Sequence, residues 1–87
     1  MAYNDPYHKF GDVLLRLRKE ITSENCFVYF VDATHNKTVF VRQQYLYEIL
    51  ENKRIKFTEN YSLKEIELTS EMENWLEQTY YKLDETI

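Results

Sequence analysis

The most reactive side chains of this sequence are one cysteine and two histidines, and they are widely spaced. His8 is expected at the start of a helix, His35 in a hairpin loop and Cys26 at the start of a strand. A metal site needs His, Cys or carboxylate ligands at recognisable spacing, and a nucleophilic thiol needs a base beside it. A single glycine cannot build a phosphate-binding loop. We therefore expect no catalytic residues, no metal and no cofactor.

Carboxylates dominate the C-terminal third. Residues 58–87 hold eight Asp/Glu and two Lys/Arg, a balance of −6, whereas residues 1–57 hold nine Lys/Arg and seven Asp/Glu, a balance of +2. A solvated acidic helix face would explain this asymmetry, and so would a surface that meets a basic partner. Glu73, Glu77 and Tyr81 follow one another at intervals of four, which places them in one exposed row on a helix. Like charges four residues apart are unfavourable to a helix, so their retention favours a role in binding.

A second cluster combines basic and aromatic residues in the middle of the chain. Its basic members are Lys37, Arg42, Lys53, Arg54 and Lys56, and its aromatic members are Tyr45 and Tyr47. Aromatic rings can stack on bases while cations contact phosphates. The net charge of the whole chain is −4, however, and no helix-turn-helix or RNA-binding fingerprint is present. Nucleic-acid binding through the Arg42–Lys56 patch is therefore the alternative hypothesis.

Length and composition indicate one small cytoplasmic domain. The 87 residues predict a single domain over 1–87 with loose ends at 1–4 and 84–87. The longest apolar run has six residues, too short for a signal-peptide core or a membrane span. One cysteine cannot form an internal disulfide, which agrees with a reducing compartment.

The other elements are predicted around a strand at Cys26–Val31, which is apolar at every position. A strand that is apolar on both faces needs cover on both, or an interior place in a sheet. The polar loop Asp32–Lys37 and the β-branched run Thr38–Val41 complete a predicted antiparallel hairpin.

An amphipathic helix is predicted before this hairpin. Asp5 is suited to the N-cap and Pro6 to the first helical position. Apolar residues then recur at helical spacing at Phe10, Val13, Leu14, Leu17 and Ile21.

The remaining chain predicts a short helix at Tyr45–Asn52, a brief strand at Ile55–Phe57 and a long last helix. Residues 63–68 fit an edge strand or a helix start, and their alternation favours the strand. Ser70 and Glu73 form a capping box that opens the last helix. The buried stripe of that helix is Met72, Leu76, Tyr80 and Leu83, with Trp75 on its rim. The order is α-β-β-α-β-(β)-α, an α+β fold in which helices pack on an antiparallel sheet.

With no chemical motif, surface complementarity remains as the expected function. We expect a small non-catalytic protein that binds another protein as inhibitor or adaptor, or that forms a homodimer, with no membrane association. The expected contact residues are Glu73, Glu77, Tyr81, Tyr45 and Tyr47. Aromatic rings would anchor the partner, and carboxylates would steer its basic surface. The excess of Phe, Tyr, Met, Ile, Asn and Lys is typical of AT-rich coding sequences, which indicates a low-GC bacterium or one of its phages as the source. A phage- or mobile-element-encoded protein of this kind would act on a host protein.

Overall fold

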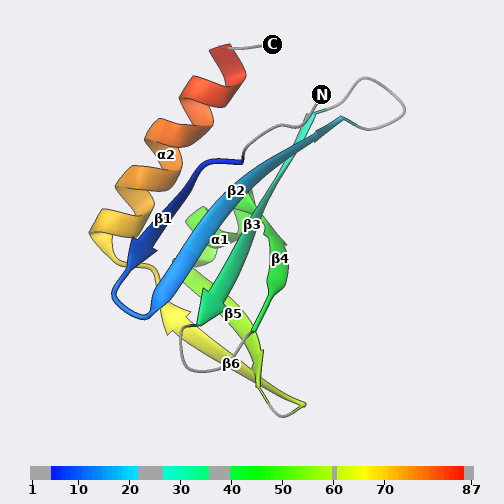
Figure 1. The fold of residues 1–87 in the computed structure, drawn as a ribbon, viewed down its shortest axis with the longest axis vertical. Helices are drawn as coiled ribbons and strands as arrows, with labels where there is room; N and C mark the ends of the chain where they lie inside the picture. The colour runs from blue at the N-terminus through cyan, green and yellow to red at the C-terminus, as the bar shows by residue number, and fades with distance from the viewer. Residues whose placement is uncertain (1–4, 22–26, 36–39, 60, 86–87) are drawn as a thin grey trace.

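The computed structural model describes residues 5–21, 27–35, 40–59 and 61–85. In chain order, its elements are β1 (Tyr7–Phe10), β2 (Val13–Ile21), β3 (Phe27–His35), β4 (Arg42–Tyr45), α1 (Leu46–Asn52), β5 (Arg54–Glu59), β6 (Ser62–Glu67) and α2 (Ser70–Glu85). Strands β1 to β4 form an antiparallel sheet in sequence order, and β5 and β6 form a separate hairpin (Figure 1). The predicted α+β class is confirmed, as is the antiparallel sheet packed by helices.

The predicted first helix is wrong, because residues 7–21 form the hairpin of β1 and β2. Phe10 pairs directly with Val13, so Gly11 and Asp12 are a two-residue turn. Gly11 has a φ of 61°, the left-handed value that a type II′ hairpin turn requires at its first central position. Beyond the turn, burial follows a strand period of two, with Val13, Leu15 and Leu17 buried.

Strand β3 is longer than predicted and is paired on both edges. It runs to His35, so residues 32–35 belong to the strand and not to a loop. The return strand predicted at Thr38–Val41 is displaced, since β4 begins at Arg42, which pairs with Ala33. Residues 38 and 39, like Cys26, lie outside the described ranges. The expected interior position of the apolar strand is confirmed, with β2 on one side and β4 on the other.

The second half of the chain follows the predicted pattern closely. Helix α1, strand β5 and strand β6 are all present, so residues 63–67 adopt the preferred strand conformation. Helix α2 begins at Ser70 as predicted, but the residue that caps it is Thr69. The Met72 backbone N–H donates to Thr69 Oγ1 at 3.2 Å. A threonine hydroxyl in this position satisfies one of the free amides of the first turn.

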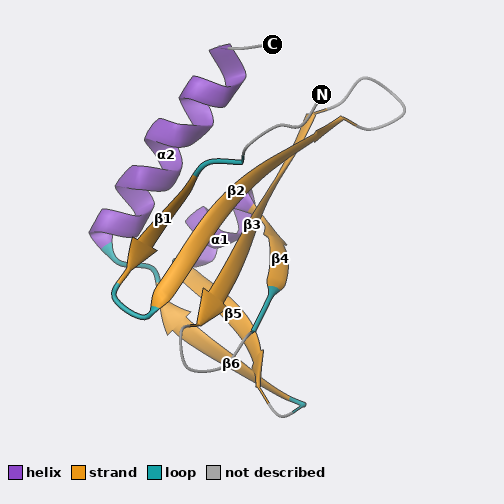
Figure 2. Cartoon of the chain, in the orientation of Figure 1, coloured by secondary structure: helices purple, strands orange, loops and turns teal. Residues whose placement is uncertain are grey.

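The core lies between one face of the four-stranded sheet and the layer formed by α1, α2 and the β5–β6 hairpin (Figure 2). Its most completely buried apolar residues come from every part of this arrangement: Leu15, Leu17, Val31, Ile49, Ile55 and Leu76. No described helix covers the opposite, outer face of the sheet. Side chains of β3 on this outer face, such as Val28, Phe30 and Thr34, are only half-buried.

The buried side chain of Gln44 joins the sheet to the hairpin. Its Nε2 donates to the Lys56 carbonyl oxygen, and its Oε1 accepts from the Lys56 backbone N–H, both at 3.0 Å. An amide side chain with both groups satisfied can be buried at little cost. This pair of hydrogen bonds holds the end of β4 against β5, directly before the residues that enter α1.

Candidate protein-binding groove

A groove of about 440 Å³ lies where β3, the β4–α1 junction and α2 meet. Its deepest members are Tyr29 and Leu46, both buried, and the half-buried Val28 and Leu50 lie beside them. Strand β3 runs past the end of β4 here, because the last paired residue of β4 is Tyr45, opposite Phe30. The sheet is therefore one strand narrower at this corner, and the helices complete the concave surface.

One wall of the groove is formed by Tyr45 and Tyr47. Their ring centroids are 5.6 Å apart. Tyr45 is 43% exposed and Tyr47 is 63% exposed. Tyr45 also lies against Phe30, at a centroid distance of 5.2 Å. The Gln44 hydrogen bonds fix the backbone beside this wall. The pair of rings is thus exposed to solvent but attached to a firmly held junction.

The opposite wall is formed by Glu77, Tyr80 and Tyr81 of α2. Residues three and four positions apart share a helix face, which explains why Glu77 lies beside both tyrosines. The ring of Tyr80 packs edge to face on Tyr29, whereas 64% of Tyr81 is exposed. Tyr80 therefore anchors the helix, and Tyr81 presents its ring to solvent.

Glu77 is the only charged residue among the described residues that line the groove. Three other acids of the second half of the chain are in ion pairs. Glu73 pairs with Lys53, Glu59 with Lys64 and Glu65 with Arg54. Glu77 forms no ion pair within the described ranges, so no described cation offsets its negative charge in the groove.

Four of the five partner-binding residues expected from the sequence line this groove: Tyr45, Tyr47, Glu77 and Tyr81. The fifth, Glu73, lies one helical turn away and bonds the Lys53 ammonium. Lys53 follows α1 in a left-handed conformation, and its backbone N–H donates to the Ile49 carbonyl at 2.8 Å. Glu73 therefore ties the end of α1 to α2 and lies outside the groove.

The basic residues of the nucleic-acid alternative do not form one unopposed surface. Lys53 is paired with Glu73, and Arg54 Nη1 lies 3.9 Å from Glu65 Oε2. Lys56 is half-buried and its backbone is held by Gln44, while Arg42 is exposed at the start of β4. Residue 37 lies outside the described ranges.

The histidines occupy aromatic environments. The His8 ring lies 4.6 Å from that of Phe10 and 6.0 Å from that of Trp75, and the His35 ring lies 6.1 Å from that of Phe40. His8 is on β1 and His35 ends β3, in place of the expected helix start and loop. Within the described ranges, no three His, Cys, Asp or Glu side chains gather as a metal site would require.

An ion cluster on the outer face of the sheet was missed by the sequence analysis. Asp32 is 2% exposed, and its Oδ2 lies 2.5 Å from Arg16 Nη2 and 3.5 Å from Arg18 Nη1. The register places Arg16 directly opposite Asp32. The predicted helix and loop had assigned these residues to unrelated elements. The available signal was that Asp32 directly follows the apolar run and is itself followed by Ala33 and Thr34, which allows β3 to continue past it.

The fold and groove define a small mixed α+β protein with an aromatic, acidic concave surface. Known protein families, curated protein sequences and solved structures provide no significant match to the chain. None of the described helices is long and apolar enough to cross a membrane.

Proposed function

We propose that this protein is a non-catalytic module that binds another protein through the groove, as an inhibitor or adaptor. The observation that carries the proposal is the convergence of Tyr45, Tyr47, Glu77 and Tyr81 on one concave surface. These residues come from segments far apart in the sequence. A concave surface lined by tyrosines can bury a partner's side chain on several sides at once.

The exposed tyrosines of the groove are more useful for binding than for stability. Tyr47 and Tyr81 leave about two thirds of their surface in solvent, 63% and 64%, so the core gains little from them. Tyrosine is enriched at protein interfaces, because its rigid ring covers a large area and its hydroxyl tolerates water. Burying both rings against a partner would recover the hydrophobic free energy that the free protein does not use.

The groove is also held in shape before a partner arrives. Tyr80 packs on the buried Tyr29 at a centroid distance of 4.5 Å, and Gln44 holds the Tyr45 junction by two hydrogen bonds. Interfaces that need little ordering bind more tightly for the same area. The amino-acid composition, typical of AT-rich coding sequences, fits a low-GC bacterium or one of its phages, and the target of a phage protein would be a protein of the host.

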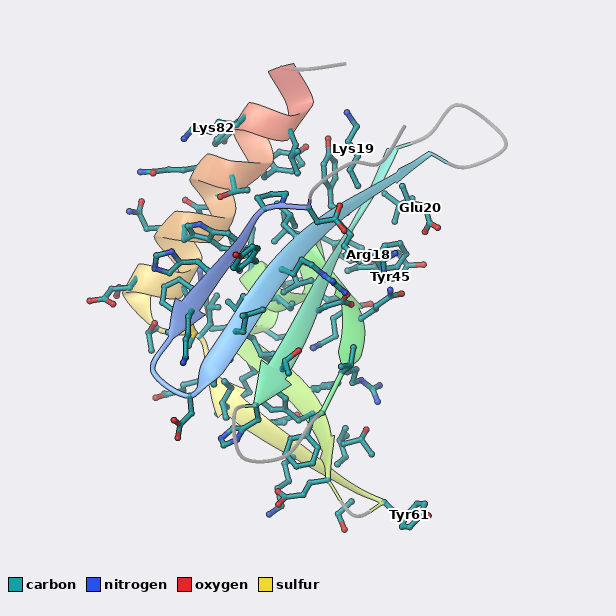
Figure 3. The ribbon with its side chains drawn as sticks, viewed as in Figure 1. Arg18, Lys19, Glu20, Tyr45, Tyr61 and Lys82 are labelled. Carbon is teal, nitrogen blue, oxygen red and sulfur yellow. The ribbon has the colours of Figure 1, made fainter. Side chains whose placement is uncertain are left out.

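Affinity capture with matched tyrosine variants tests this proposal. Tagged wild-type protein, a Tyr47→Ser/Tyr81→Ser double variant and a Tyr61→Ser control would be incubated with bacterial lysate, with and without nuclease. Tyr61 is fully exposed at the tip of the β5–β6 hairpin, away from the groove (Figure 3). We expect the wild type and the control to capture a protein whose retention does not change when nuclease is added. The double variant should no longer capture that protein.

Photo-crosslinking then places the partner on the surface. A photoreactive phenylalanine analogue at position 47 should crosslink the captured protein, and the same group at position 61 should not. Equal capture by the groove variant and the control would contradict the proposal. Capture that disappears with nuclease would favour the nucleic-acid alternative instead.

A further inference from the structure

We propose that the groove receives an arginine side chain of the partner protein, an inference that rests on the proposed function of the groove in protein binding. The evidence is its combination of tyrosine rings on two walls with one carboxylate that forms no ion pair among the residues the structure describes. Each part of this lining matches one part of an arginine side chain.

The charge of the groove selects a cation. Glu77 is the only charged group in the described lining, and it forms no ion pair within the described ranges, unlike Glu73 one turn earlier. An anionic ligand would meet this carboxylate with no cation in the lining to offset the repulsion. A cationic side chain would meet a carboxylate whose charge is still available. A carboxylate and a guanidinium can form two parallel hydrogen bonds, which fixes both distance and orientation.

The rings select a flat cation. Tyr45 and Tyr47 lie on one wall with an interplanar angle of 30°, and Tyr80 and Tyr81 lie on the other with an angle of 63°. The negative faces of aromatic rings attract cations, and a planar guanidinium can also stack on them. An ammonium group cannot stack in this way, so the lining fits arginine better than lysine.

The floor of the groove suits the aliphatic part of the same side chain. Leu46 and Leu50 present apolar groups between the two walls. The three methylene groups of arginine can lie along apolar surface while the guanidinium stays at a polar site. Apolar neighbours of the arginine in the partner segment would cover the remaining floor.

A pair of peptides that differ in one charge tests the inference directly. The first is a blocked five-residue peptide with arginine at its centre and leucine on either side. The second replaces arginine by citrulline, which has nearly the same shape and no charge. In an NMR titration of the wild type, the arginine peptide should shift the ring signals of Tyr47 and Tyr81 to saturation, with Tyr61 unaffected. The citrulline peptide should bind about tenfold more weakly, which corresponds to about 1.4 kcal/mol.

A charge-neutral variant identifies the carboxylate responsible. Glu77→Gln should weaken arginine-peptide binding about tenfold and remove most of the difference between the two peptides. Glu71→Gln is the matched control, because Glu71 is an exposed acid on the same helix outside the groove lining. It should leave both titrations unchanged. Both variants should keep the dispersed amide spectrum of the folded wild type.

The inference is overturned if the two peptides bind equally, if neither binds, or if Glu77→Gln leaves the arginine preference intact. These failures differ from a failure of the proposed function. Partner capture that depends on Tyr47 and Tyr81 but not on Glu77 would keep the groove as a protein-binding site while rejecting an arginine occupant. Capture that is indifferent to the tyrosines would reject the proposed function itself.

Discussion

The ring of Tyr29 meets the ring of Tyr80 edge to face, with centroids 4.5 Å apart. This contact joins the central strand β3 to α2 and lies at the base of the groove. Tyr29 is 9% exposed, so the contact is largely shielded from water. The position of Tyr81, the next residue along α2, depends on how firmly Tyr80 is held.

The Tyr29–Tyr80 contact should therefore show energetic coupling. Tyr29→Ala should lower the free energy of unfolding by about 3 kcal/mol, because a buried ring is removed. In a double-mutant cycle with Tyr80→Ala, the coupling should be about 1 kcal/mol, as for other aromatic pairs in contact. Urea melts of the four proteins measure both quantities. Strictly additive losses would show that the two rings do not stabilise one another.

The two faces of β3 should differ in their sensitivity to truncation. Val31 is fully buried on the core face, whereas Val28 is half-buried on the face that no described helix covers. Val31→Ala should cost about 2 kcal/mol and Val28→Ala less than about 1 kcal/mol, since each methyl group contributes in proportion to its burial. Denaturant melts provide the comparison. Equal losses would mean that the outer face is also covered.

The carboxylate of Asp32 should contribute to stability far more than that of an exposed acid. Asp32→Asn should cost about 2 kcal/mol, because the buried group would lose its charge-assisted bonds to Arg16 and Arg18. Glu65→Gln is the matched control. Its partner Arg54 lies 3.9 Å away on the surface, and the change should cost at most about 0.5 kcal/mol. A negligible effect at Asp32 would contradict a structural role for the cluster.

The groove residues should affect binding without affecting stability. Glu77→Gln combined with Tyr81→Ser should leave the free energy of unfolding within about 0.5 kcal/mol, as expected for exposed side chains. Affinity for the captured partner should fall at least about tenfold. The contribution of Glu77 should shrink as salt rises, because exposed charges are screened. Glu73→Gln is the control, because Glu73 lies outside the groove. An equal loss of affinity from this variant would indicate that the binding surface extends along α2 beyond the groove.

The nucleic-acid alternative predicts that the protein binds oligonucleotides, which the protein-binding proposal does not. If Arg42 and Arg54 contact phosphates, wild-type protein should retard oligonucleotides at low salt, where such contacts are strongest. Reversing both charges should then abolish the shift. We expect no shift from the wild type, because Arg54 lies beside Glu65 and the whole chain has a net charge of −4. A salt-sensitive shift that the double reversal removes would establish nucleic-acid binding.

Local periodicity in the sequence determined the C-terminal half of the fold. In α2, Leu76 is fully buried, Met72 is 5% exposed and Tyr81 is 64% exposed, as their helical spacing predicts. The alternation of Ile66 with Glu65 and Glu67 likewise predicted strand β6. The pattern of α2 was sufficient because it has one dominant period and a recognisable start, whereas for β6 the alternation had to be preferred over a possible helix start.

Residues 7–21 needed the tertiary structure, because their apolar pattern satisfies both periods. Val13, Leu14 and Leu17 fit a helical stripe, whereas Val13, Leu15 and Leu17 fit one face of a strand. All nine residues of β2 pair with residues of β3, and this pairing makes the segment a strand and not a helix. Leu14 then lies on the outer face, opposite Thr34. In the sequence, Gly11 could also be a destabilising residue inside a helix. Only its φ of 61° shows that it forms a turn.

The groove shows the same division between local and long-range information. The interval of four placed Glu73, Glu77 and Tyr81 in one row, and the abundance of tyrosine suggested a binding surface. Only the packing of α1 and α2 beside β3 decides that Glu77 and Tyr81 line the groove with Tyr45 and Tyr47, while Glu73 bonds Lys53. Spacing determines which side chains share a helix face, but contacts between distant segments determine what that face meets.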